Sequence, residues 1–166
     1  AIGVDASVAS LNALEWFNLV LEQNGFLGST VAGGIELNQG ANILNNWDFH
    51  GGTWEGNKGA AEARFIDCNG IHIYGLYTES SLTATSVVDG LIFGGNTVAT
   101  LSGLHSVADA PIFSHVGPAV RCIGTSKVSI DNPYFGATSW VTDISVEDTA
   151  TLTLVAKGNL DPAKLL

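Results

Sequence analysis

The stretch RFIDCNGIHI (residues 64–73) decides the fold, because it places two short alternating apolar segments around a small polar turn. Four other segments align with it: IELNQGANIL (35–44), LIFGGNTVATL (91–101), VRCIGTSKVSI (120–130) and ISVEDTATLTL (144–154). The first apolar residues after the turns are Ile43, Ile71, Val98, Val128 and Leu152, about 24 to 30 residues apart. This period predicts stacked coils, each of which buries its apolar face against its neighbours.

The alternation inside each segment predicts which side chains share a column along the stack. One inward column is Phe65, Cys122 and Val146, a second contains the five residues named above, and a third is Ile73, Ile130 and Leu154. The alternating residues His72, Ala99, Ser129 and Thr153 are predicted to face outward. Agreement between the short and the long period makes the solenoid prediction stronger than either pattern alone.

The first segment of the chain has a different apolar spacing. Ser10 is a potential N-cap, Gly25 is a stop signal, and Leu11, Leu14, Phe17, Val20 and Leu21 fall on one helical face. We therefore expect a capping helix over residues 10–24 that covers the open end of the stack. Residues 1–166 form one domain in this interpretation, with coils over 35–157 and a C-terminal tail over 158–166 that packs on the last coil or on a neighbouring subunit.

Composition and charge exclude several classes of function. The chain is 46% apolar and 13% charged, with 20 glycines and a net charge of −10. Nucleic acid binding requires a basic stripe, and the six Lys and Arg are scattered. No apolar run is long enough to span a membrane, and no signal peptide is visible. Cys68 and Cys122 lie two coils apart, too far for a disulfide, so both are predicted to be free, which favours synthesis in a reducing cytoplasm.

These coils, of the form apolar-x-apolar, turn, apolar-x-apolar, resemble the right-handed parallel β-helix of the pectate-lyase-like superfamily, and in particular the short β-helices of bacteriophage tailspikes and related virion proteins. The resemblance covers roughly residues 10–157 and supplies the right hand of the coil. It implies an all-β fold of about five coils and assembly as a homotrimer on a virion. The polygalacturonase motifs are missing, and Arg64 and Arg121 have no grouped Asp in register, so the calcium cluster of pectate lyases is not expected.

Candidate binding residues lie mainly in the first two coils. A glycoside hydrolase needs two carboxylates that flank one groove, and Asp48, Glu55, Asp67 and Glu79 are the available acids. The aromatic residues Trp47, Trp54, Tyr74 and Tyr77 could stack on sugar rings, or could instead fill the core or a subunit interface. The surface candidates for a ligand are therefore Trp54, Tyr77, Asp48, Glu55 and Glu79.

No catalytic residue, metal site or cofactor is predicted. His50 and His105 are expected in one column with Thr78 between them, about 9–10 Å apart and without a third ligand. The resulting hypothesis is a structural virion protein, a tailspike or fibre module or a capsid decoration protein. It would be assembled in the host cytoplasm as a rigid homotrimer, and would contact other virion proteins and a host surface glycan. The alternative is a polysaccharide hydrolase or lyase, or a glycan-binding domain.

Overall fold

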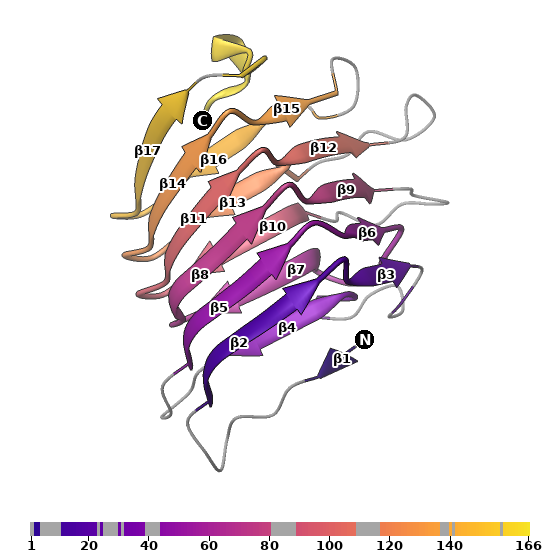
Figure 1. Ribbon diagram of the computed structural model, residues 1–166. Coiled ribbons are helices and arrows are strands. Elements are labelled where there is room, and N and C mark those ends of the chain that lie inside the picture. Colours follow the sequence, from indigo (N-terminus) through magenta and orange to yellow (C-terminus); the bar gives the residue numbers. More distant parts are fainter. Residues whose placement is uncertain are drawn as a thin grey trace.

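The computed structural model is an all-β parallel solenoid, in which the chain winds repeatedly through three sheets (Figure 1). The structure describes residues 2–3, 11–22, 24, 30, 32–38, 44–80, 89–108, 117–136, 140, 142–156 and 158–166. Every pairing between neighbouring strands is parallel, and each coil contributes in turn a strand to sheet A, to sheet B and to sheet C. The parallel β-solenoid predicted from the repeat is confirmed.

The three sheets contain most of the described chain. Sheet A consists of β1 (Ile2–Gly3), β4 (Ile35–Asn38), β7 (Ala61–Ile66), β10 (Asp89–Gly94), β13 (Val120–Cys122) and β16 (Ile144–Val146). Sheet B consists of β2 (Leu11–Phe17), β5 (Leu44–His50), β8 (Asn69–Tyr74), β11 (Val98–Ser102), β14 (Lys127–Asp131) and β17 (Thr151–Ala156). Sheet C consists of β3 (Val20–Glu22), β6 (Thr53–Glu55), β9 (Tyr77–Ser80), β12 (His105–Ala108) and β15 (Tyr134–Phe135).

The core follows the predicted columns, with one correction. Phe65, Cys122 and Val146 share a column that Leu37 and Phe93 complete, and both cysteines are buried and free. The column of Ile73, Ile130 and Leu154 is likewise confirmed. In the remaining column Ala99, and not Val98, lies between Ile71 and Val128, so Ala99 is buried and Val98 is exposed. Ile43 lies outside the described residues.

The predicted helix over residues 10–24 is wrong, because residues 11–17 and 20–22 are the strands β2 and β3. Two backbone irregularities produce the helix-like spacing of the apolar residues. Ala13 has φ +56°, so the strand contains an extra residue between Leu11 and Leu14, and Asn18, with φ +50°, turns the chain between the two strands. Within the described residues the only helix is a short 3₁₀ turn, Pro162–Lys164.

The strands of residues 11–22 also change the length of the stack. Sheets A and B each contain six strands, so the number of coils differs from the five predicted. The additional coil precedes the first repeat recognised in the sequence, where the bulge at Ala13 hides the alternation.

The C-terminal tail packs on the last coil, which is the first of the two positions predicted for it. Leu165 pairs in parallel with Ile144, and Leu166 exchanges backbone hydrogen bonds with Ile144 and Val146, so residues 164–166 extend sheet A past β16. Asn159 closes sheet C, because its side-chain amide accepts from the Phe135 amide and donates to the Phe135 carbonyl, both at 2.6 Å. The side chain of Asn159 thus replaces the backbone of a further strand.

We expect Asn159→Ala to lower the free energy of unfolding by about 1–2 kcal/mol, because the amide and carbonyl of Phe135 lose their partners. Urea denaturation followed by circular dichroism measures this change. Asn159→Asp keeps the acceptor and loses the donor, so its effect should be intermediate. Equal stability of all three proteins would show that the amide does not close the sheet.

Candidate functional site

Sheets B and C meet at a sharp corner, here called the outer corner. One residue with positive φ makes this turn in each coil: Asn18, Gly51, Gly75, Gly103 and Asn132. Glycine and asparagine tolerate this left-handed conformation best, which explains why these residue types recur at the position. The turn places the last outward residue of each sheet B strand beside the first outward residue of the next sheet C strand.

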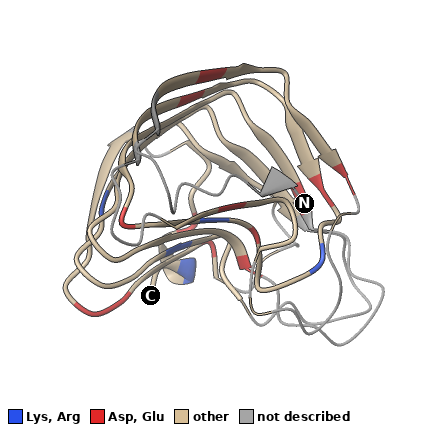
Figure 2. Cartoon of the chain, turned by 90° about the horizontal axis from the view of Figure 1, so that it is seen from below, with Lys and Arg blue, Asp and Glu red and all other residues tan. Residues whose placement is uncertain are grey.

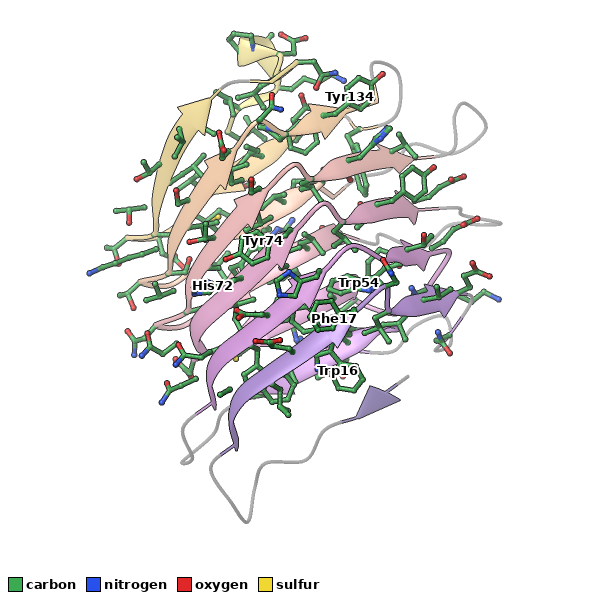
Figure 3. All side chains as sticks on the ribbon, in the orientation of Figure 1. Trp16, Phe17, Trp54, His72, Tyr74 and Tyr134 are labelled. Carbon is green, nitrogen blue, oxygen red and sulfur yellow. The ribbon has the colours of Figure 1, made fainter. Side chains whose placement is uncertain are left out.

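An aromatic column lies on the sheet B side of the outer corner. Phe17, His50 and Tyr74 are in register on β2, β5 and β8, with Phe17 and Tyr74 visible on the outer face in Figure 3. Phe17 stacks on His50 with ring centroids 4.8 Å apart, and His50 stacks on Tyr74 at 5.1 Å with an interplanar angle of 14°. Each ring therefore covers a face of its neighbour, and a face of Tyr74 away from His50 remains at the end of the column.

The column stops at Tyr74 because the next coil offers only small side chains. Ser102 follows Tyr74 in register and Asp131 follows Ser102. The tyrosine hydroxyl lies 3.2 Å from Nδ1 of His72, so the ring leans back along its strand towards His72, whose neighbour in the next coil is Thr100. Thr100 and Ser102 thus lie on the strand next to Tyr74, and Asp131 lies one strand further along the same face, about 9–10 Å from Tyr74 across the sheet. We call Tyr74, Thr100, Ser102 and Asp131 the Tyr74 step.

A second aromatic column lies on the sheet C side of the outer corner. Tyr77, His105 and Tyr134 are in register on β9, β12 and β15. His105 meets both tyrosines edge-on, with centroid distances of 5.2 Å to Tyr77 and 4.4 Å to Tyr134. Tyr134 is 48% exposed, and His105 lies in the same coil as Ser102 of the Tyr74 step. Rings therefore line both sides of the corner.

The two tryptophans of the predicted aromatic group belong to the core. Trp54 is 0% exposed and packs edge-on against Phe49 at 5.4 Å, and Trp47 is also buried. The strand β6 has its middle residue inward, which places Trp54 inside the solenoid. Trp54 was predicted as a surface candidate and does not lie on the surface, whereas Tyr74 and Tyr77 do face outward.

Three of the four predicted acids lie on the two sides of the outer corner, whereas Asp67 lies in the turn between β7 and β8, where it accepts from the Asn96 amide. Asp48 lies on sheet B, with its Oδ1 3.7 Å from Nδ1 of His72. Glu55 and Glu79 lie on sheet C as direct neighbours in register, and the Tyr77 hydroxyl donates to Glu79 Oε2. The structure therefore brings Glu55, Glu79 and Tyr77 together on one face and leaves Asp48 on another. Figure 2 shows Asp and Glu on the strands on both sides of this corner.

The histidines do not form the predicted column. His50 pairs with Phe17 and Tyr74 in sheet B, whereas His105 pairs with Tyr77 and Tyr134 in sheet C. Thr78 is a buried residue that donates a hydrogen bond to Ser106 at 2.8 Å. Across the described ranges, no group of three or more His, Cys, Asp or Glu side chains is arranged to hold a metal ion.

The outer face of sheet A carries ion pairs that the sequence interpretation missed. Arg64 binds the Glu36 carboxylate in register, with Nε donating at 2.8 Å. Arg121 lies 3.2 Å from Asp89 and 3.4 Å from Glu147. Burial raises the pKa of Asp89 to about 6 although Arg121 opposes the shift. The register places Glu36 opposite Arg64, but Arg121 is opposite Ile92 and Ser145, so the column pattern signals the first ion pair and not those of Arg121.

A second buried acid links three coils. Asn57 donates to Glu62 Oε2 from its side chain at 2.7 Å and from its backbone at 3.3 Å, and also donates to the Leu21 carbonyl at 2.9 Å. Asn24 donates to Asn57 Oδ1 at 3.0 Å. Glu62 is 1% exposed, and this burial raises its pKa from 4.5 to about 8. This carboxyl is therefore mainly protonated at neutral pH.

Comparison of the chain with family models, with curated proteins and with solved structures gives no match. The described part of the chain contains no helix that is long and apolar enough to cross a membrane. What the geometry defines is thus a class, a parallel β-solenoid whose outer corner combines aromatic rings, hydroxyls and carboxylates.

Proposed function

We propose that this protein is a non-catalytic glycan-binding β-solenoid, and that the Tyr74 step holds a sugar ring. The observation that carries the proposal is the uncovered face of Tyr74 at the end of the aromatic column, with Thr100 and Ser102 beside it. A sugar ring presents C–H groups on its face and hydroxyls around its rim, so it matches an aromatic face bordered by hydrogen-bonding groups. The sugar ring would stack on Tyr74 and so continue the aromatic column at the position where the next strand has only the small side chain of Ser102.

The arrangement favours binding over hydrolysis. Cleavage of a glycosidic bond requires two carboxylates that flank the bond from opposite sides. Asp131 is the carboxylate of the Tyr74 step and follows Ser102 in register on sheet B. Glu55 and Glu79 are direct neighbours on sheet C, so these two carboxylates lie on one side of the outer corner and do not flank the step. A sugar on Tyr74 would have Asp131 on one side and the Tyr74 ring on the other.

We expect Tyr74→Ala to weaken glycan binding by roughly tenfold or more, because the side chain is the aromatic anchor of the step. A glycan array identifies the ligand, and calorimetry with the best oligosaccharide measures the change. Tyr74→Phe keeps the ring and should bind nearly as well as the wild type. Phe17→Ala is the matched control, since it removes an exposed ring of the same column that does not border the step. No binding to any glycan, or equal loss in both alanine variants, would overturn the proposal.

A second candidate function is the one that the resemblance implies: a structural module of a bacteriophage virion, in a tailspike, a fibre or a capsid decoration protein, that works as a homotrimer. It is favoured by the other end of the outer corner, where Phe17 is 66% exposed and Val20 is 58% exposed. Adjacent exposed apolar side chains mark contact surfaces in many proteins. Here Phe17 and Val20 would meet another subunit, while the Tyr74 step would face outward to a host glycan.

Light scattering across a dilution series tests the second candidate. A stable species of three times 17.2 kDa supports it, and Phe17→Ala should then shift the protein towards monomer. A monomer at every concentration would exclude a self-sufficient trimer and leave glycan binding unaffected.

A further inference from the structure

We propose that the sugar held at the Tyr74 step carries a free amino group, which forms an ion pair with Asp131. This inference rests on the proposed glycan-binding function and names the ligand class for the same site. Neutral and acidic glycans are then the disfavoured ligands.

The first argument is that Asp131 has an open carboxylate. Its side chain points outward from β14, half-buried, directly beyond Ser102. Within the described residues the Asp131 side chain makes no hydrogen bond or ion pair, in contrast to Asp48 beside His72 and Glu79 beside Tyr77. A ligand amine would therefore meet an acceptor that no protein group already occupies.

The second argument is the absence of competing basic groups. Among the described strands, β2, β5, β8 and β11 contain no Lys or Arg, and neither does any strand of sheet C. Lys127 begins the strand that ends with Asp131, and four residues of extended chain separate them by ~13 Å. Lys157, which follows Ala156, the register partner of Asp131, lies outside the described residues. With respect to the described strands, a uronic acid placed on Tyr74 would face Asp131 without a Lys or Arg beside it, which is unfavourable by like-charge repulsion.

The third argument concerns the strength of the contact. A hydrogen bond between an ammonium and a carboxylate is about twice as strong as one between neutral groups. A sugar hydroxyl could also donate to Asp131, so a neutral sugar should bind, but more weakly. We expect roughly a tenfold preference for the free amine over the acetylated amine.

The test is a comparison of three oligosaccharides of equal length by calorimetry in mildly acidic buffer: an oligomer of glucosamine, its fully N-acetylated counterpart and an oligogalacturonate. We expect the glucosamine oligomer to bind about tenfold more tightly than the acetylated one, and the galacturonate to bind least. Asp131→Asn should remove the preference. Asp148→Asn is the charge-matched control, because Asp148 lies in an exposed turn at the other end of the sheet B strands.

The outcomes separate this inference from the function on which it rests. Equal binding of the free and acetylated oligomers, with loss of both in Tyr74→Ala, would overturn the amine preference and support the sugar site. A preference for the amine that falls equally in Asp131→Asn and Asp148→Asn would assign it to the general negative charge of the protein, and a preference that survives in Asp131→Asn would overturn the role of Asp131. Failure of all three to bind, together with an empty glycan array, would overturn both proposals.

Discussion

Replacement of Trp54 by alanine is expected to lower the free energy of unfolding by about 3–5 kcal/mol, the range for truncation of a large buried aromatic residue. Trp54 is fully buried between its register neighbours Leu21 and Thr78, and its ring packs edge-on against Phe49. Alanine leaves a large cavity at this position, which the rigid coils on either side cannot close. Chemical denaturation followed by circular dichroism measures the effect.

Two controls sharpen this prediction. Trp54→Phe should cost much less, because it keeps most of the buried ring and the indole N–H has no hydrogen-bond partner within the described chain. Tyr134→Ala removes a half-exposed ring from the outer corner and should change stability by less than about 1 kcal/mol. If Trp54→Ala were as stable as the wild type but defective in glycan binding, Trp54 would belong to the surface and the core described above would be wrong.

Glu62→Gln is expected to make the protein more stable than the wild type at alkaline pH. The carboxyl of Glu62 has a pKa of about 8 in the folded protein and an ordinary value of 4.5 when exposed, mainly because burial disfavours its charged form. The unfolded chain therefore releases this proton at lower pH than the folded chain does. The contribution of Glu62 to the free energy of unfolding is therefore most favourable below pH 4.5, and it falls as the pH rises from 4.5 to about 8.

The loss from Glu62 alone is on the order of 5 kcal/mol, from the linkage between pKa and stability. Glutamine does not titrate, so the difference in unfolding free energy between Glu62→Gln and the wild type should grow with pH across this window and level off above it. Asp89 also has a raised pKa and acts in the same direction, but it is present in both proteins and cancels in the difference. Glu22→Gln makes the same chemical change at an exposed position and is the control for the substitution itself. A constant difference for Glu62→Gln would mean that Glu62 is ionised in the folded state.

The sequence predicted the columns wherever the coils have equal numbers of residues between turn and strand. Val98 was assigned inward because it is the first apolar residue after its turn. The strands β5 and β8 each contain a left-handed residue, Asn46 and Gly70, at equivalent positions. The next strand, β11, lacks this residue, so the register between β8 and β11 shifts between Val98 and Ala99. Ala13 has the same effect in β2, where it turned a strand alternation into an apparent helix period. Bulges depend on the pairing of neighbouring strands, so a local pattern does not reveal them.

The candidate site was less predictable than the fold. Tyr77, Glu55 and Glu79 lie together on sheet C, whereas Asp48, which was grouped with them, lies on sheet B. Trp54 was taken for a surface residue because its position in a three-residue strand is not apparent from alternation alone. The Tyr74 step was missed altogether. The step exists because the residue that follows Tyr74 in register is Ser102 and not a further aromatic residue. The sequence alone does not show which residue follows Tyr74 in register, so it does not show where the aromatic column ends.

The single left-handed residue at each turn of the outer corner also bears on how such a chain can change over evolutionary time. Because Asn18, Gly51, Gly75, Gly103 and Asn132 occupy equivalent places, a segment from one of them to the next is a complete circuit of the solenoid. Duplication or deletion of such a segment would lengthen or shorten the protein while the hydrogen bonding at each junction is preserved. The position of Ser102 within that series would then decide how far from either end the ligand is presented.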